Sequence, residues 1–399
     1  MKRRRAAALA VIALLAAACG SHRSSRHALP VAKGPTGVVR IALAHLLWPL
    51  DPARAEGRDE IAVARMLFST PLKTDPRTGL VRPGLCSAWS ASADRRLWRF
   101  RCRHAPAIAS ELRRVHVIAA GRIEASHDLL RVSLPTPDAR LPYRLTEVAA
   151  APRGVDGPFR LVSGERKRIV AQRGSLRLEI RRLEPHAALR LYRHGRLDEA
   201  PLPLGELRAL QRDPALKEQV RVRRLVAVDV VVFEPHGSLA RQTELRRVYD
   251  DTADRADYQA LVPEFAAPPA ENLVERGRPS ARAAVLAARR ARQRIRSLPR
   301  VAVRFAKPSD PDLAYAAALL VGSWRDLGLG AFLGNGLPDA RFERLLAPYP
   351  RLDALAAAVR GEAVVPIAWV VDARLVSPRL RGWREDDLGA VDYTRVVTR

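Results

Sequence analysis

The alternation of apolar and polar positions along the chain predicts an ordered succession of short strands and helices. Strand-like patterns occur at Val38–Leu43, Leu129–Leu134 and Val226–Phe233, the last almost wholly apolar, as in a strand covered on both faces. Helical spacing of apolar residues marks Ile61–Phe68, where Asp59 is the expected N-cap. Strands that alternate with helices in this way indicate an α/β fold with mixed sheets.

The clearest unit lies in the last third of the chain. Val301–Phe305 alternates as a strand, Asp310 then offers an N-cap, and a helix with one apolar stripe ends at Gly328. A strand followed by a helix and a glycine stop is the building block of parallel or mixed sheets. A long helix rich in Ala and Arg is expected before this unit, at Ser280–Ser297.

The two cysteines of the chain body flank a predicted β-hairpin whose turn lies near Asp94. Trp98, Phe100 and Cys102 share one face of its second strand. A hairpin centred on this turn places Cys86 directly opposite Cys102, close enough to bridge. We therefore predict a disulfide between these two cysteines; a register error of one residue would leave two buried free thiols instead.

The N-terminus has the organisation of an export signal. Basic residues at Lys2–Arg5 precede an apolar stretch, Ala6–Ala18, which is too short to span a bilayer but fits the core of a signal peptide. The small residues before Cys19 resemble a lipobox, although the usual Leu stands one place early. Residues 1–19 are thus predicted to be a lipoprotein signal with Cys19 as the lipidation site, and 20–36 a flexible tether. A plain signal peptide cut nearby is the alternative.

The composition is strongly basic, but the basic residues do not cluster in one segment. The chain has 399 residues, 69 Lys and Arg against 42 Asp and Glu, and a net charge of +27. The Arg residues are scattered along the whole chain and interleave with acidic ones, which favours a compositional bias over a nucleic-acid surface. We do not expect nucleic acid as a partner. The length suggests two or three lobes.

The sequence offers no catalytic motif. It contains no Gly-x-Ser-x-Gly, His-Glu-x-x-His, P-loop or Cys-x-x-Cys pattern, and His186 and His194 lack the spacing of helical metal ligands. We therefore predict no catalytic residue, no metal site, no cofactor and no enzymatic activity.

The order of motifs between Leu50 and Arg103 resembles the N-terminal lobe of family 5 solute-binding proteins, whose members bind peptides, oligopeptides and nickel complexes. That family has a Leu-Asp-Pro loop, a helix, an Asp-Pro turn, a Pro-Gly-Leu segment ending at Trp, and a Trp-x-Phe strand. The corresponding segments here are Leu50–Pro52, Arg65–Leu72, Asp75–Gly79, Pro83–Trp89 and Leu97–Phe100. Weaker matches follow in order at Gly157–Phe159, Gly195–Asp198, Arg246–Arg255 and Val365–Ile367.

The resemblance implies a two-lobed α/β fold of the type II periplasmic-binding-protein kind, with mixed sheets in each lobe and a cleft between them. Residues 37–233 would form lobe I, with a subdomain reduced to about 104–155. Residues 234–362 would form lobe II, and 363–399 would return to lobe I. The chain is shorter than usual members, and the acidic stretch that holds a peptide's amino terminus in that family has no clear counterpart.

The resemblance also implies a monomeric, exported lipoprotein on the outer face of the bacterial cytoplasmic membrane. It would capture a peptide or similar small solute and deliver it to an ABC permease. Candidate ligand contacts at strand ends facing the cleft are His45, Leu46, Trp48, Glu234, His236 and Trp369. Trp48 would be a ligand platform and Glu234 a partner for a cationic group, although core packing and surface exposure account for such residues equally well.

Two alternative functions stay open. The chain could be a degenerate binding-protein fold that acts as an envelope sensor or interaction lipoprotein. It could also be a basic surface protein that binds anionic polymer.

Overall fold

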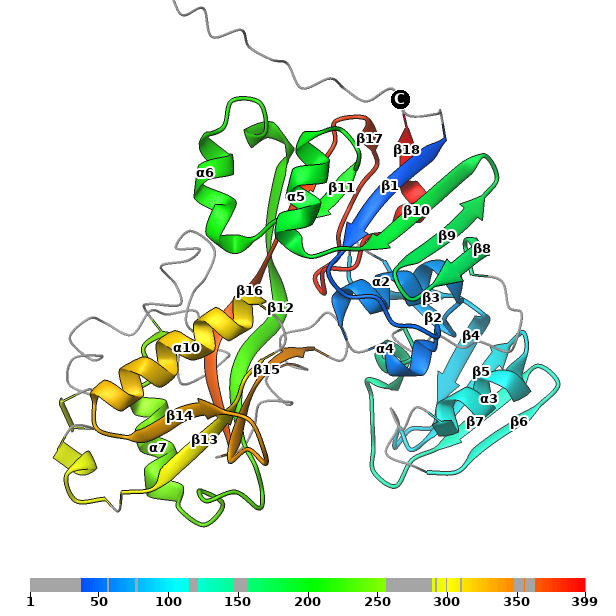
Figure 1. Cartoon of the computed structure of the whole chain (residues 1–399). Helices are drawn as coiled ribbons and strands as arrows, with labels where there is room; N and C mark the ends of the chain where they lie inside the picture. The colour runs from blue at the N-terminus through cyan, green and yellow to red at the C-terminus, as the bar shows by residue number, and fades with distance from the viewer. Residues whose placement is uncertain are drawn as a thin grey trace, which may run out of the picture.

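A single large sheet runs through both halves of the molecule. The computed structural model describes residues 37–55, 57–75, 78–114, 121–146, 157–255, 289–290, 293–298, 300–308, 311–347, 355 and 363–398. Within these residues the sheet has ten strands (Figure 1) in the order β14-β13-β15-β12-β16-β11-β1-β10-β9-β8. Both parallel and antiparallel pairs occur in it, so the α/β fold with mixed strand directions is confirmed.

One end of this sheet, with the helices on it, forms lobe I. β1 lies parallel to both β10 and β11, and its buried side chains pack against α2. Helices α5 and α6 pack with β11 and β16 in a second core cluster. The elements of lobe I are β1 (Val38–Leu43), α2 (Arg58–Leu67), β8 (Arg160–Glu165), β9 (Arg168–Arg173), β10 (Leu176–Arg182), α5 (Pro185–Arg193), β11 (Glu199–Pro201) and α6 (Leu207–Arg212).

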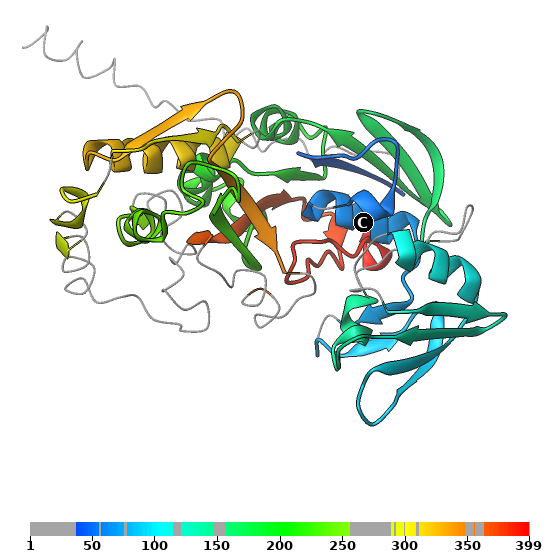
Figure 2. The ribbon, with the colours of Figure 1, turned by 90° about the horizontal axis from the view of Figure 1, so that it is seen from below.

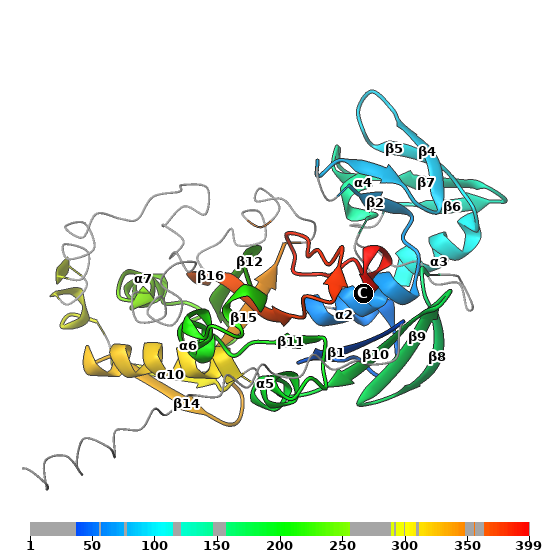
Figure 3. The same ribbon diagram turned by 90° about the horizontal axis from the view of Figure 1, so that it is seen from above.

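A subdomain projects from lobe I as a separate small sheet. Its strands follow the order β4-β5-β7-β6, and α3 packs on one face with its own hydrophobic core. Figures 2 and 3 show it set apart from the large sheet, at the end of the molecule opposite β13 and β14. Its elements are β2 (Leu72–Thr74), β3 (Val81–Pro83), β4 (Cys86–Ala91), β5 (Leu97–Cys102), α3 (Ala105–Arg114), β6 (Ile123–Ser126), β7 (Leu129–Ser133) and α4 (Leu141–Arg144).

The other end of the large sheet forms lobe II, around an aromatic core. Trp324 of α10 is fully buried and stacks on Phe305 of β13, while its indole nitrogen donates to the backbone oxygen of Tyr249. Gly328 takes a positive φ of 89° directly after the helix, which lets the chain turn back into β14. The elements of lobe II are α7 (Thr243–Asp251), β13 (Ala302–Ala306), α10 (Pro311–Asp326), β14 (Gly330–Gly334) and β15 (Ala340–Leu346).

Two long strands, β12 (Val220–Phe233) and β16 (Val364–Val376), belong to both lobes. They pair antiparallel along most of their length. Val222 of β12 packs with the lobe I helices, whereas Phe233 at its other end lies in the lobe II core. The chain therefore passes between the described lobes through paired β-strands, an arrangement suited to hinge motion. The exact lobe boundaries along the chain stay a prediction. After β16 the chain ends in β17 (Leu380–Arg381) and β18 (Val397–Thr398).

Most predicted elements occur close to where the pattern placed them, with two differences. α2 begins after Gly57, so Asp59 is not its N-cap. Its carboxylate is buried instead and accepts hydrogen bonds from the backbone of Ala44 and His45 after β1. β12 begins at Val220, earlier than the apolar run predicts, because Arg221, Arg223 and Arg224 interrupt the apolar pattern in its first half. Asp310, Cys19 and most of 280–297 lie outside the described residues.

No helix among the described residues is long and apolar enough to cross a bilayer.

The predicted disulfide is present in the subdomain. Cys86 and Cys102 are directly paired across β4 and β5, with an S–S distance of 2.03 Å, and both are buried beside Trp98 and Phe100. The bridge closes a loop whose ends are 16 residues apart. It therefore restricts the unfolded chain as well as joining the first and last residues of the hairpin.

Replacing both bridging cysteines, as Cys86→Ala/Cys102→Ala, is expected to lower the free energy of unfolding of the subdomain by about 2–4 kcal/mol. Denaturant unfolding, followed by the fluorescence of its tryptophans, measures the loss. Reduction of the wild-type chain should reproduce the shift, and reductant should leave the variant unchanged. Equal stability of oxidised wild type and variant would contradict this expectation.

Candidate functional site

The predicted ligand residues that follow β1 have three different environments. His45 is exposed, and Leu46 is buried in the lobe I core. The indole of Trp48 is 37% exposed and lies against Gly164 of β8, so closely that a Cβ there would meet it at 2.6 Å. Trp48 thus presents an accessible aromatic face at the rim of lobe I.

The predicted residues near the crossing into lobe II are likewise dispersed. Glu234 forms an ion pair with Arg341 of β15 at 2.5 Å, and His236 is exposed on the following turn. Trp369 of β16 is nearly buried, at 8% exposure, and the guanidinium of Arg224 stacks over its ring at 5.2 Å. The role of all six residues in ligand binding stays a prediction.

Trp369 belongs to an apolar cluster at the junction between the lobes. This junction cluster combines side chains of β12, β15, β16 and the C-terminal segment, including Val228, Val230, Trp369 and Leu388. Tyr143 from α4 of the subdomain packs against it. Segments far apart in the sequence therefore meet at the base of the two lobes, where a hinge would act.

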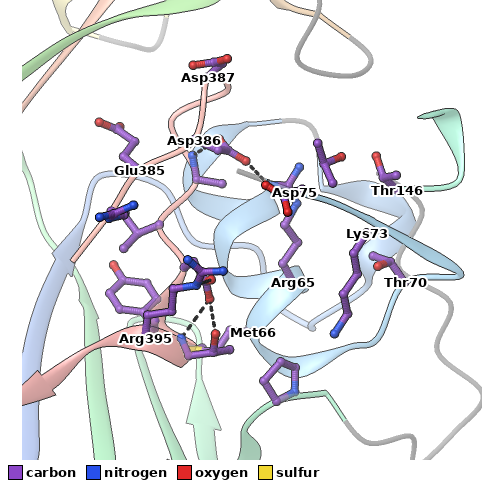
Figure 4. A pocket seen from close by; sticks show the side chains of 18 of the residues that line it. Arg65, Met66, Thr70, Lys73, Asp75, Thr146, Glu385, Asp386, Asp387 and Arg395 are labelled. Carbon is purple, nitrogen blue, oxygen red and sulfur yellow. Dashed lines mark hydrogen bonds and ion pairs between the residues drawn. The ribbon is translucent and has the colours of Figure 1, made fainter. Parts of the chain in front are cut away.

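A cavity of about 560 Å³ lies beside this junction, between α2, the β2–β3 hairpin, α4 and the C-terminal segment 384–395. Figure 4 shows Lys73 and Asp75 on the hairpin side, and Glu385 and Asp386 across from them. Its volume lies within the range of sites for small organic ligands. Tyr143 both lines the cavity and packs on the junction cluster.

No sequence motif predicts this cavity. Its walls come from the loop after β2, from Pro158 and Phe159, and from the end of the chain, which no local motif connects. The available signal was the Trp-Arg-Glu-Asp-Asp run at 383–387, where acidic and aromatic residues follow a buried strand.

A buried arginine holds the C-terminal segment behind the cavity. Arg374 of β16 is 2% exposed and donates to Asp372 at 2.9 Å, Glu199 at 2.7 Å and Asp59 at 3.2 Å. It also donates to the backbone oxygen of Gly389 at 3.2 Å. One guanidinium thus joins α2, β11, β16 and the C-terminal segment, and leaving any of these buried groups unpaired would be costly.

Other side chains complete this buried charge cluster. Glu199 also accepts from the indole of Trp383 at 2.8 Å and from the hydroxyl of Tyr393 at 3.1 Å. Its complete burial raises its pKa above the ordinary value, against the pull of Arg374. Arg58 of α2 forms a further ion pair with Asp372.

Two carboxyl groups of the cluster, Asp372 and Glu385, have pKa values shifted in opposite directions. Burial opposes ionisation of Asp372, but the guanidiniums of Arg58 and Arg374 outweigh it and hold the pKa of Asp372 below its usual range. Burial, and then the negative charge of Asp372, raise the pKa of Glu385 to about 10. Glu385 therefore carries a proton at neutral pH and faces Asp372 as a neutral acid.

Further contacts fasten the cavity wall to β12 and to α2. Asp387 forms an ion pair with Arg223 of β12, and its backbone oxygen accepts from Val226 at 2.7 Å. Asp386 forms an ion pair with Arg65 of α2, which Figure 4 shows as a dashed line. The C-terminal segment thus connects β12 to the cavity.

No group of three or more His, Cys, Asp or Glu side chains in the described part of the chain is placed to hold a metal ion.

Comparison with solved structures places this arrangement in a known fold. The murein tripeptide binding protein MppA of Escherichia coli has a TM-score of 0.75 at 14% identity, over 92% of this chain and 99% of that chain. An oligopeptide-binding protein of Borrelia burgdorferi has a TM-score of 0.74 at 13% identity, and the match covers 91% of this chain and 100% of that chain. OppA of Haemophilus influenzae, in complex with the peptide RPPGFSPFR, has a TM-score of 0.71 at 16% identity, and the match covers 92% of this chain and 99% of that chain. No protein-family model and no curated protein matches the sequence.

The chain therefore has the two-lobed fold of peptide-type solute-binding proteins, as the motif resemblance implied. At this level of identity the likeness establishes the fold along nearly the whole chain, and the ligand is a separate question.

The protonation of Glu385 predicts a specific dependence of stability on pH. The ordinary pKa of 4.5 applies when the chain unfolds, and about 10 when it is folded. The contribution of neutral Glu385 to the free energy of unfolding is fully present below about pH 4.5. As the pH rises towards 10 this free energy falls by up to about 1.4 kcal/mol per pH unit, because the unfolded chain releases the proton and the folded chain keeps it. Glu385→Gln, which keeps the neutral shape, should therefore become progressively more stable than wild type above pH 5.

Denaturant unfolding at pH 5, 6.5 and 8 measures this difference. The matched control is Glu218→Gln, at an exposed glutamate of lobe I, which should show a constant difference. A Glu385→Gln variant that is equally or more destabilised at pH 8 than at pH 5 would show that Glu385 is ionised in the folded chain.

Proposed function

We propose that the chain is a solute-binding protein that captures a small solute, such as a short peptide, between its lobes. The observation that carries this proposal is the pair of long strands, β12 and β16, which join two separately packed lobes and carry Trp369 at their junction. Such an arrangement supports closure around a ligand without disturbing either core. The structural similarity to peptide-binding proteins, which extends over nearly the whole chain, supports the same conclusion. Binding without chemistry accords with the lack of a catalytic motif in the sequence.

The export signal and Cys19 support a lipid-anchored form at the cell envelope, tethered by residues 20–36. In this position a closed, loaded chain would deliver its solute to an ABC permease. The proposed ligand contacts are His45, Leu46, Trp48, Glu234, His236 and Trp369, of which Trp48 offers the most accessible aromatic face. In this proposal Trp48 contacts the ligand from lobe I, and Glu234 and His236 contact it from the start of lobe II.

Closure is testable by energy transfer between dyes placed on the two sides. Arg131→Cys on β7 and Leu337→Cys on the exposed loop after β14 provide the labelling sites, in a full-length chain carrying Cys19→Ser. Addition of short peptides, amino acids or nickel chelates that raise the melting temperature should also raise transfer efficiency. The control pair, Arg131→Cys with Lys167→Cys, should not change, because both sites lie outside lobe II.

The outcomes separate the candidate functions. A saturable thermal shift with a change in transfer supports solute capture. No thermal shift with any small solute, in a well-folded chain, contradicts it and favours an envelope scaffold. Binding of anionic polymers alone, lost steeply with salt, would favour the basic surface protein.

A further inference from the structure

The cavity beside the junction lies outside the proposed cleft. Its described lining comes from α2, the β2–β3 hairpin, α4, residues 158–159 and the C-terminal segment. All of these belong to lobe I, its subdomain or the chain end after β16, and none of the described lining residues comes from lobe II. Closure of the two lobes would not be needed to form it.

The acidic side chains of this cavity are already neutralised. Glu385 lies 3.8 Å from the guanidinium of Arg374, and burial together with the charge of Asp372 raises its pKa above the ordinary value, which favours the neutral form. Each of the other acidic lining residues has a basic partner, in the pairs Asp75–Arg82, Asp386–Arg65, Asp387–Arg223 and Asp392–Arg395.

Two basic side chains remain in surplus. Lys73 from β2 and Arg384 from the C-terminal segment both line the cavity. In the described part of the chain neither has an ion pair. Figure 4 shows the ammonium end of Lys73 extending into the cavity.

The remaining lining offers a hydroxyl donor and an apolar floor. The hydroxyl oxygen of Thr74 is buried and has no hydrogen-bond partner among the described residues. Met66, Phe159, Val391 and Tyr393 are buried side chains that form the floor. A buried hydroxyl without a partner is costly, and an oxygen of a ligand would satisfy it.

We propose that this cavity is a second binding site, separate from the interlobe cleft, for a small organic anion. Its carboxylate or phosphate group is held by Lys73, Arg384 and the Thr74 hydroxyl, and its apolar body lies on the floor. The two cations stand on different chain segments, so the anion bridges the subdomain to the C-terminal segment.

Isothermal titration of the full-length chain carrying Cys19→Ser tests the proposal with probes that share one body. Hexanoate and hexyl phosphate should bind, and whichever binds tighter identifies the anionic group. Hexylamine and hexanol should not bind measurably, and inorganic phosphate should bind more weakly than hexyl phosphate because it lacks the apolar body. Lys73→Gln and Arg384→Gln should each weaken binding of the anions about tenfold. Lys167→Gln, at an exposed lysine of lobe I, should not.

Three results would overturn the proposal. The first is equal binding of hexylamine or hexanol, and the second is no binding of either anion to a folded chain. The third is a loss of anion binding in the Lys167→Gln control as large as in the two cavity variants.

The interlobe dye pair separates this site from solute capture. Anion binding in the cavity should leave energy transfer between the lobes unchanged, because lobe II does not contribute to the described lining. Failure of closure with every solute would contradict the function proposed above and leave this site intact.

Discussion

Arg374 and the carboxylates around it set the positions of the parts on which the site depends. A fully buried guanidinium holds Asp59 of α2, Glu199 of β11 and Asp372 of its own strand. Each of these charges would be expensive to bury alone, so they are stable only as a set. Because the same arginine bonds to the backbone at Gly389, the C-terminal segment is fixed against lobe I. The cavity wall and the contact to β12 both follow from that position.

The cluster also explains why the C-terminal part of the chain matters so much to the architecture. β16 returns from lobe II and brings Arg374 into lobe I, after which the segment turns over α2 and reaches β12 through Asp387. The C-terminal segment therefore links β12, the subdomain side and the lobe I core. Motion of the lobes would occur about strands that this segment braces on one side.

The sequence allowed the fold to be predicted more fully than the site. The apolar periodicity predicts the positions of β1 and α10 well, and the position of the hairpin turn predicts that Cys86 pairs with Cys102. Both predictions depend only on local spacing in the sequence. The expectation that Asp59 caps α2 is wrong because its carboxylate is buried against the backbone of Ala44 and His45 and against Arg374, which lies 315 residues away. The cavity likewise joins β2 to residues near the C-terminus, and no local pattern carries information about such long-range contacts.

The most direct test of this account is amide hydrogen exchange of an Arg374→Met variant. Loss of the guanidinium leaves buried carboxylates unpaired, which usually costs about 3–5 kcal/mol. Amides of residues 384–395 should then exchange at least about a hundredfold faster, while α10 in lobe II keeps its wild-type rates. Unchanged exchange in 384–395, or an equal acceleration in α10, would contradict the claim that Arg374 holds the C-terminal segment in place.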